Sequence, residues 1–581
     1  MRRIPSILLL TMTFGAMAVA QIPAADSRNT DIPNTDTHFV PASYKTLAEW
    51  TARRQEIRTQ ILSAAGLLPM LPKSPLHPEI FGRIQTKNYS VEKVLIETLP
   101  GFYLAGNLYR PVKAPPPGGF PGIIQPHGHW NYGRLENSDT ASPVSLAANL
   151  ARQGFVVFTY DMVGYNDTIQ TPHDFGDQPL QQLWSFSALG LQLWDSIRAI
   201  DFLQQLPGVN ADRIGATGAS GGGTQTFLVS AVDDRIKFSA PANMVSLLMQ
   251  GGGICENAPG LRLGTNNVEI AAMMAPRPML LAGATGDWTR NLQTEEFPAI
   301  REIYQLYDHA PDVAMFFQEA PHNYNRPNRE ATYTFFARHA LEQAAETTVK
   351  EASMAPQKLQ DLMVLHDRKL PENALTFDQL FAEWRQLSSA QTSDVRERLT
   401  SALATEWPGH LLSKGEGQNI VLGRQGKGDR IPALWIKGSN PPALVIHPDG
   451  IEAARRNPAA EALVKAGRSV LFIDAFQTGS AVAPRNREVK MFLTFNRSDD
   501  QNRAQDILTA LAWLNQPGTT LIGLGKAAIW CEFAAAVAPI KLDLQADLSG
   551  FQGTDEQFAN EFFVPGIQRA GGLKAAQSLL Q

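Results

Sequence analysis

The stretch that decides the fold is GATGASGGGTQTF, residues 215–227, because it permits two incompatible interpretations. Its glycines can form the turn that cradles the phosphates of a dinucleotide cofactor. The same residues contain the pattern G-x-S-x-G from Gly218 to Gly222, a sharp strand-to-helix turn that exposes a nucleophilic serine, here Ser220. The flanking sequence decides between a cofactor site and a nucleophile.

Around this turn, apolar runs of strand length alternate with runs of helical periodicity. The expected strands lie in 118–130, 156–167, 212–218 and 277–289, and the expected helices in 142–155, 193–206 and 223–232. This alternation is typical of βαβ units and a parallel sheet. A helix over 47–68 and a β-hairpin over 89–111 precede it. The sequence therefore predicts an α/β fold with a mostly parallel, doubly wound sheet.

The cofactor interpretation fails on its context. A phosphate-binding turn follows the first strand of its domain, whereas at least two expected strands precede residue 215. No Tyr-x-x-x-Lys pair, the proton donor of a short-chain dehydrogenase, occurs after residue 223, and Thr224 stands where that enzyme pattern requires glycine. We therefore expect no nicotinamide and no other cofactor.

The nucleophile interpretation requires a base and an orienting acid in the chain order Ser, Asp or Glu, His. Asp287 follows the apolar run in LLAGATGDWT, and His322 lies in the expected loop of FFQEAPHNYN. His309 in a polar turn and His339 in an expected helix suit a base less well. Glu256 is the alternative acid. The sequence predicts a Ser220, Asp287 and His322 triad.

In such a triad the serine Oγ attacks an acyl carbon, the histidine takes its proton, and the aspartate holds the imidazole tautomer. The developing oxyanion needs two N–H donors. We expect one from the backbone of Gly221 and one from that of His129 in the loop QPHGHW.

His127 and His129 form an H-x-H pair that is compatible with zinc, but no further His, Cys or carboxylate cluster accompanies it at metal-ligand spacing. We therefore predict no metal, and expect His127 to be buried and hydrogen-bonded to its loop. Cys255 and Cys531 are expected to be buried free thiols, with an inter-domain disulfide as the alternative.

Five segments together resemble α/β-hydrolases of the acetyl xylan esterase and dienelactone hydrolase group, over about residues 40–340. They are PHGHW, YDMVGYND, RIGATGASGGGTQT, EIAAMMAPRPMLL…GDWT and HNYN. The H-G-H loop resembles the H-G-Y loop of acetyl xylan and cephalosporin-C deacetylases, whose third residue supplies an oxyanion N–H. Those deacetylases carry Gln after the serine and glucuronoyl esterases carry Arg, whereas this chain has Gly221. The resemblance thus implies the fold and ester hydrolysis, and leaves the ester open.

The second half repeats the first in a degenerate form. Four features recur in the same order, from His447-Pro-Asp-Gly450 to the strand LIGLG. Gly525 stands where the serine should be, and no histidine follows His447. We therefore predict a signal peptide at 1–20, a catalytic domain at 21–345 with a helical and hairpin lead-in, and a pseudo-hydrolase domain at 346–581. The last domain is expected to pack on the first or to help bind substrate.

Several residues are candidates for substrate binding. Trp130, Trp184 and Trp288 fall in expected loops on the side of Ser220, where aromatic rings stack on sugars. The alternatives are that Trp184 belongs to a lid core and that Trp288 packs under the acid loop. In the glycine-rich segment 251–262, Cys255, Glu256 and Arg262 are candidates to face a pocket, with an ordinary surface charge as the alternative for Arg262 and for Arg290. Arg262 or Arg290 would suit a uronate carboxylate.

The composition and the N-terminal sequence limit which partners and which location we expect. The 581 residues carry 51 basic and 56 acidic side chains, a net charge of −5 that gives no reason to expect nucleic acid. Residues 1–20 combine a basic start, an apolar run and small residues, a pattern typical of a signal peptide cleaved after Ala20; a membrane anchor is the alternative. No other stretch resembles a membrane span, so we expect an exported, periplasmic or extracellular protein.

The sequence thus favours a secreted serine esterase that deacetylates an ester-decorated polysaccharide. A uronic-acid ester, either glucuronoyl or pectin methyl, is the close alternative. A serine peptidase of the prolyl-oligopeptidase type is an alternative of another class, although no β-propeller repeat is visible. A non-enzymatic pair of binding modules fits poorly with an intact Ser, Asp and His set. The sequence does not indicate an oligomeric state.

Overall fold

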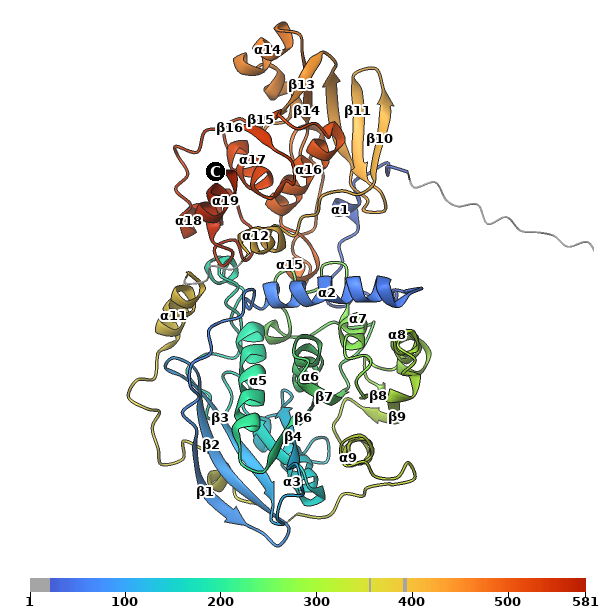
Figure 1. Ribbon diagram of the computed structural model, residues 1–581, viewed down its shortest axis with the longest axis vertical. Coiled ribbons are helices and arrows are strands. Elements are labelled where there is room, and N and C mark those ends of the chain that lie inside the picture. Colours follow the sequence, from blue (N-terminus) through green and yellow to red (C-terminus); the bar gives the residue numbers. More distant parts are fainter. Residues whose placement is uncertain (1–20, 355–356, 390–393) are drawn as a thin grey trace, which may run out of the picture.

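The structure, a computed structural model, describes residues 21–354, 357–389 and 394–581. The expected signal peptide at 1–20 lies outside the described residues. The described chain folds into two α/β units, each built on its own sheet, with helix α2 (Leu47–Ala64) lying at their junction (Figure 1). None of the described helices has the length and apolar character needed to span a bilayer.

The first sheet has nine strands in the order β1-β2-β3-β5-β4-β6-β7-β8-β9. Strands β1 to β3 are antiparallel to their neighbours, and the rest run parallel. Their bounds are β1 Glu79–Gln85, β2 Tyr89–Leu99, β3 Phe102–Pro111, β4 Phe120–Pro126, β5 Val156–Tyr160, β6 Val209–Ala219, β7 Ile236–Ala242, β8 Met279–Gly286 and β9 Val313–Pro321. The expected α/β fold and the hairpin over 89–111 are confirmed.

Helices cover both faces of this sheet. On one face α5 (Ala188–Gln205) and α6 (Gly221–Val232) pack together, and α2 adds Trp50, Ile57 and Ile61 to the same core. On the other face α3 (Pro143–Gln153) packs against α9 (Arg326–Ala340). α7 (Asn267–Ala272) and α8 (Phe297–Leu306) follow on the side of β8 and β9 (Figure 1). Such two-sided cover explains why the parallel strands read as continuous apolar runs.

The second sheet has seven strands in the order β10-β11-β12-β14-β13-β15-β16, again with three antiparallel strands before a parallel part. The bounds are β10 Leu411–Glu416, β11 Asn419–Arg424, β12 Ile431–Ile436, β13 Ser439–Ile446, β14 Arg468–Ile473, β15 Thr519–Gly523 and β16 Leu542–Ala546. This order repeats that of β1 to β7, including the exchanged pair β5-β4. The shared order supports the interpretation of the second unit as a copy of the first.

Helices also cover both faces of the second sheet. α16 (Asp499–Leu514) and α17 (Ala527–Val537) lie on one face, and α13 (Ile451–Arg455) and α14 (Pro458–Lys465) lie on the other. α12 (Val395–Leu403), α18 (Asp555–Glu561) and α19 (Gly572–Leu580) complete the unit towards the first one, and α11 (Phe377–Ser389) lies beside the junction (Figure 1). Both cysteines are buried and free, as expected.

The first described residues do not stay with the first unit. The short helix α1 (Ser27–Thr30) lies against the second unit, where Ser27 N–H donates to Gly428 O and Arg28 binds Asp506 at 2.6 Å. Burial raises the pKa of Asp506 to about 6, although the Arg28 guanidinium counteracts part of that rise. The N-terminal segment therefore ties the two units together instead of serving only as a lead-in to the first.

Candidate active site

Ser220 occupies the turn between β6 and α6. It is the N-cap of α6 with φ 58° and ψ −128°, a backbone conformation that residues other than glycine rarely adopt. Its N–H donates to Ala242 O on the adjacent strand β7 at 3.1 Å. The expected sharp strand-to-helix turn is therefore present, with the strain of a positive φ placed on the serine itself.

The glycines around Ser220 make room for the neighbouring backbone. A Cβ added at Gly218 would lie 2.3 Å from Pro126 O, and one at Gly222 would lie 2.4 Å from the same oxygen. A Cβ at Gly223 would lie 2.7 Å from Ala242 O. Because the obstructing atoms are main-chain oxygens of β4 and β7, no rotamer change can relieve these clashes. The turn can therefore pack between the ends of β4 and β7 only if these three positions are glycines.

Asp287 and His322 meet at the same edge of the sheet. Asp287 directly follows β8 and His322 directly follows β9, so both lie at the carboxyl ends of parallel strands, as Ser220 does. His322 Nδ1 lies 2.9 Å from Asp287 Oδ2, and the Asp287 side chain is fully buried. A carboxylate only accepts, so Nδ1 carries the proton and Nε2 presents a lone pair.

Other polar groups hold the aspartate in place. Asn243 Nδ2 donates to Asp287 Oδ2 at 2.8 Å, and Asn328 Nδ2 donates to Asn243 Oδ1 at 3.2 Å. The N–H of Thr289 donates to Asp287 Oδ1 at 3.3 Å. Asn243 was not expected from the sequence, although a polar residue directly after an apolar strand (β7 ends at Ala242) is the signal that marked Asp287.

The other nitrogen of His322 is free to accept a proton. Its Nε2 is buried and has no hydrogen-bond partner among the described residues. The ring lies between two tryptophans, with centroids 6.0 Å from Trp130 in a stacked arrangement and 4.4 Å from Trp288. Trp288 Nε1–H in turn donates to Asn243 O at 2.9 Å. Two of the three candidate sugar-stacking tryptophans therefore flank the imidazole.

The loop after β4 lies against the serine. A Cβ at Gly128 would lie 3.0 Å from Ser220 Cβ, and one at Gly221 would lie 2.6 Å from His129 Cε1. His127 fixes this loop, because its Nε2 accepts the Met162 N–H at 3.0 Å and its Nδ1–H donates to Gly128 O at 2.7 Å. Burial lowers the pKa of His127 to about 3, so it stays neutral, as this pair of hydrogen bonds requires.

The two backbone groups expected to bind an oxyanion are therefore close to the serine. The Gly221 N–H is the first of α6, and the first N–H groups of a helix have no intrahelical acceptor. The His129 N–H belongs to the loop that packs on Ser220 through Gly128. Their role as donors to an oxyanion stays a prediction.

Glu256 and Arg262 are buried instead of facing an open surface. Glu256 Oε2 accepts the N–H groups of Gly252 and Gly253, and its Oε1 accepts the Thr224 hydroxyl at 3.1 Å. Arg262 donates to Asn267, to Asn257 and to the carbonyl of Glu256, and burial lowers its pKa to about 9. Both side chains shape the loop 251–262, and the carboxylate on His322 is that of Asp287.

Trp184 lies against residues of the second unit. It is 8% exposed in the core of the second unit, its Nε1 donates to Asp555 Oδ1 at 3.1 Å, and Arg385 lies 5.0 Å above its ring. This burial differs from the expected exposed position, and the expected role of Trp184 in sugar binding stays a prediction. The residue follows α4 (Pro179–Leu183), whose contacts to α18 carry it into the junction of the two units, close to the alternative of a lid core.

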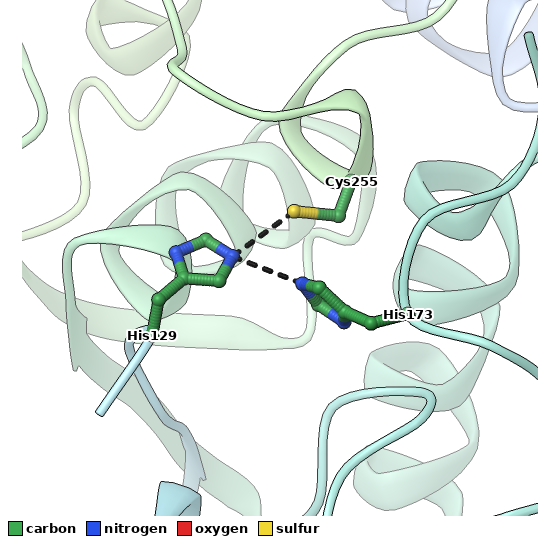
Figure 2. A group of neighbouring side chains, drawn as sticks. All are labelled: His129, His173 and Cys255. Carbon is green, nitrogen blue, oxygen red and sulfur yellow. Dashed lines mark hydrogen bonds between the residues drawn. The ribbon is translucent and has the colours of Figure 1, made fainter. Parts of the chain in front are cut away.

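Two further side chains that could bind a metal lie beside His129, although the sequence shows no such cluster at metal-ligand spacing. Its Nε2 lies 3.0 Å from His173 Nε2 and 3.0 Å from Cys255 Sγ (Figure 2). The three residues come from loops 44 and 126 positions apart, counted from His129, a separation that no short sequence motif encodes.

The second unit has a glycine in the turn that corresponds to that of Ser220. Gly525 lies in the turn between β15 and α17, two residues after the strand ends, and its φ of 53° is close to that of Ser220. The seven-stranded sheet ends at β16 and has no counterparts of β8 and β9 among the described residues. These are the strands that position Asp287 and His322 in the first unit.

Comparisons with known proteins place these features in context. No family model matches the chain. A stretch of 246 residues is 28% identical to "Putative hydrolase YtaP" of Bacillus subtilis (strain 168), covering 39% of this chain and 79% of that protein. A stretch of 247 residues is 25% identical to "4-O-methyl-glucuronoyl methylesterase" of Cerrena unicolor, covering 42% of this chain and 47% of that protein. The solved structure of "Methylesterase BT1017" aligns with a TM-score of 0.50 at 29% identity, covering 58% of this chain and 75% of the other.

Proposed function

We propose that this chain, an α/β-hydrolase of the carbohydrate esterase type, hydrolyses carboxylic esters on a polysaccharide with Ser220 as its nucleophile. The observation that carries the proposal is the meeting of three groups at one sheet edge. They are a strained serine after β6, a buried carboxylate after β8, and an imidazole after β9 whose Nε2 is buried without a partner.

The first half of the reaction acylates the enzyme. Ser220 Oγ forms a bond to the ester carbonyl carbon while His322 Nε2 accepts its proton. The hydrogen bond from Nδ1 to Asp287 stabilises the imidazolium that results. Collapse of the tetrahedral intermediate breaks the bond to the leaving alkoxide, which takes the proton from Nε2. A water molecule then repeats these steps on the acyl-enzyme and releases the acid.

Negative charge develops on the former carbonyl oxygen in both halves. The N–H groups of Gly221 and His129 are the proposed donors to that oxygen. Loss of one such donor costs roughly 2.7–4 kcal/mol of barrier in comparable sites. The two hydrogen bonds of His127 fix the loop after β4, and they therefore help to position the His129 N–H.

Two ester classes are candidates. An O-acetyl ester makes the polysaccharide the leaving alcohol, and the H-G-H loop with its likeness to deacetylases favours it. A uronate alkyl ester makes the polysaccharide the acyl group, and the names of two relatives, both methylesterases, favour that alternative. The two cases leave different groups on Ser220: an acetyl group or a whole uronyl glycan.

An ester panel tests the proposal. Purified protein is assayed on acetylated xylan, methyl-esterified pectin, a glucuronoyl ester, p-nitrophenyl acetate and a prolyl peptide p-nitroanilide. We expect hydrolysis of at least one carbohydrate ester, its loss in Ser220→Ala, and its retention in Ser549→Ala, a matched change at an exposed serine. Cleavage of the peptide alone, or carbohydrate-ester activity that survives Ser220→Ala, would refute the proposal.

A further inference from the structure

Three side chains with metal-binding atoms converge beside the candidate active site (Figure 2). His129 comes from the loop after β4, His173 from the long loop after β5, and Cys255 from the short helix η2 (Ile254–Glu256) in the loop after β7. Their donor atoms all lie within 4.8 Å of one another. All three loops leave the carboxyl ends of parallel strands, the same edge that carries Ser220.

The hydrogen bonds within this cluster cannot all be satisfied at once. His173 Nδ1–H donates to Val163 O at 2.7 Å, so the Nε2 of the neutral ring presents a lone pair. His129 Nε2 lies 3.0 Å from His173 Nε2 and 3.0 Å from Cys255 Sγ. If His129 Nε2 carries a proton, the proton points to one neighbour only; if it does not, two lone pairs face each other. One cation bound by all three atoms satisfies them together.

Neighbouring residues fix the positions of these three side chains without a bound ion. A Cβ at Gly164 would lie 2.4 Å from His173 N, which shows how closely the loop folds back. The Tyr165 ring meets the His173 ring edge-on at 4.9 Å, and Gln192 Nε2 donates to Cys255 O at 3.1 Å. A backbone carbonyl on the second nitrogen of a histidine, as on His173, is the usual way in which proteins orient a metal ligand.

The donor set selects the ion. Two imidazoles and one thiolate suit Zn²⁺ and other soft or borderline transition metals, whereas Mg²⁺ and Ca²⁺ require oxygen ligands. With Zn–N of about 2.0 Å and Zn–S of about 2.3 Å, tetrahedral geometry separates neighbouring donors by roughly 3.3 to 3.6 Å. The two separations of 3.0 Å therefore need to widen by only a few tenths of an ångström.

We propose that His129, His173 and Cys255 form a binding site for one Zn²⁺ ion, with the fourth coordination position open. Cys255 is buried and His173 half-buried, while His129 is exposed, so solvent reaches the site from one side. Sites with three protein ligands and one open position are typical of zinc that binds a water molecule or a substrate oxygen.

The ion would also connect the site to the proposed chemistry. It would join the loop of His129 to the loops of His173 and Cys255, and the His129 ring lies against Gly221, beside Ser220. This consequence rests on the proposed function, whereas Zn²⁺ binding does not. Metal binding is therefore measured directly, and a failure of esterase activity leaves that result unaffected.

The test measures bound metal in the full-length protein. Chelator-treated protein is reloaded with Zn²⁺, the bound metal is quantified by mass spectrometry, and affinity is measured against a chromophoric chelator. We expect one tightly bound Zn²⁺ per chain, and an affinity lowered roughly 100-fold or more in His173→Ala and in Cys255→Ala. Cys531→Ala, a change at the other buried free cysteine, and His309→Ala, at an exposed histidine, should bind as the unmodified protein does.

A second measurement needs no variant and covers the case in which Cys255→Ala does not fold. Co²⁺ loaded into the unmodified protein should show a near-ultraviolet thiolate-to-metal charge-transfer band. Failure of the unmodified protein to retain Zn²⁺, a Zn²⁺ affinity in both ligand variants that equals that of the unmodified protein, or a Co²⁺ spectrum without that band would each overturn the proposal. If the protein binds no Zn²⁺, we would instead assign a proton that His129 Nε2 shares with a neighbouring side chain of the cluster.

Discussion

At the scale of single residues, the candidate site is a set of groups that the fold leaves incompletely partnered. Ser220 adopts a positive φ, and His322 Nε2 is buried without a partner among the described residues. Each feature costs folding free energy, of order 1–3 kcal/mol for a strained backbone or an unsatisfied buried polar atom. Such costs concentrate where a substrate supplies the missing interaction.

Asp287→Asn tests the orienting role of the carboxylate. The amide keeps the shape of the side chain but can donate to Nδ1, which then favours the wrong imidazole tautomer. We expect kcat on the best ester to fall about 10⁴-fold with the melting temperature nearly unchanged. Steady-state kinetics and thermal unfolding measure both effects. Asp308→Asn, at an exposed aspartate, is the control, and an Asp287→Asn enzyme with ordinary kcat would exclude the role.

The residues that sequence reasoning found and those that it missed differ in how they are encoded. Ser220, Asp287 and His322 each follow an apolar strand, and the chain order of a triad relates them, so local patterns suffice to choose them. His173 and Cys255 lie within loops whose paths depend on packing, such as the close approach at Gly164. Trp184 was misplaced because its environment comes from α18, far away in the sequence.

At the scale of elements, the two units share one strand order but differ in the strands that follow it. Strands β1 to β7 and β10 to β16 follow one pattern, yet only the first sheet continues into β8 and β9. The repeated order could be anticipated from four matching motifs, because each marks a strand end or a helix. The missing strands could be anticipated only indirectly, from the lack of a histidine after His447.

Helix α5 contains a carboxyl group that the fold keeps neutral. Asp195 is buried, accepts the Thr98 hydroxyl at 2.7 Å through Oδ1, and has no partner for Oδ2 among the described residues. Burial raises its pKa to about 8, and the hydrogen bond from Thr98 offsets part of that effect. The matching residue of α16, Asp506, instead binds Arg28.

Asp195→Asn is predicted to change how stability depends on pH. An unfolded aspartate ionises near pH 4, so the stabilisation from the neutral folded carboxyl is lost as pH rises from about 4 to about 8. The amide has no proton to lose. We expect the variant to gain a few kcal/mol over the unmodified protein between pH 5 and pH 8. Denaturant unfolding at both pH values measures this, with Asp212→Asn as the exposed control; a pH-independent difference would contradict it.

At the scale of the whole molecule, the two units are joined by buried contacts. Arg569 of the second unit is 3% exposed, and it donates to Gly66 O at 2.9 Å and to Pro69 O at 2.6 Å in the first. The backbone of 260–262 pairs with that of 493–494, which ties the loop of Cys255 to the second unit. These contacts favour a packing role for the second unit, one of the two roles expected from the sequence.

Arg569→Met tests this coupling. The change keeps an apolar stem but leaves two carbonyls at the junction without donors, so we expect a loss of about 2–4 kcal/mol in unfolding free energy. Calorimetry should show one transition for the unmodified protein and a lower melting temperature for the variant. Arg456→Met, at a side chain that is 82% exposed, should have no effect. Two independent transitions in the unmodified protein would show that the units do not stabilise each other.

The assignment of Ser220 as the nucleophile is tested most directly by covalent trapping. The protein is treated with a fluorophosphonate, which reacts with activated serines, and the adduct is located by peptide mass spectrometry. We predict one adduct on Ser220, none in Ser220→Ala, and slow labelling in His322→Ala, because the base is needed to activate Oγ. Labelling at another residue, or equal labelling of the Ser220→Ala protein, would contradict the assignment.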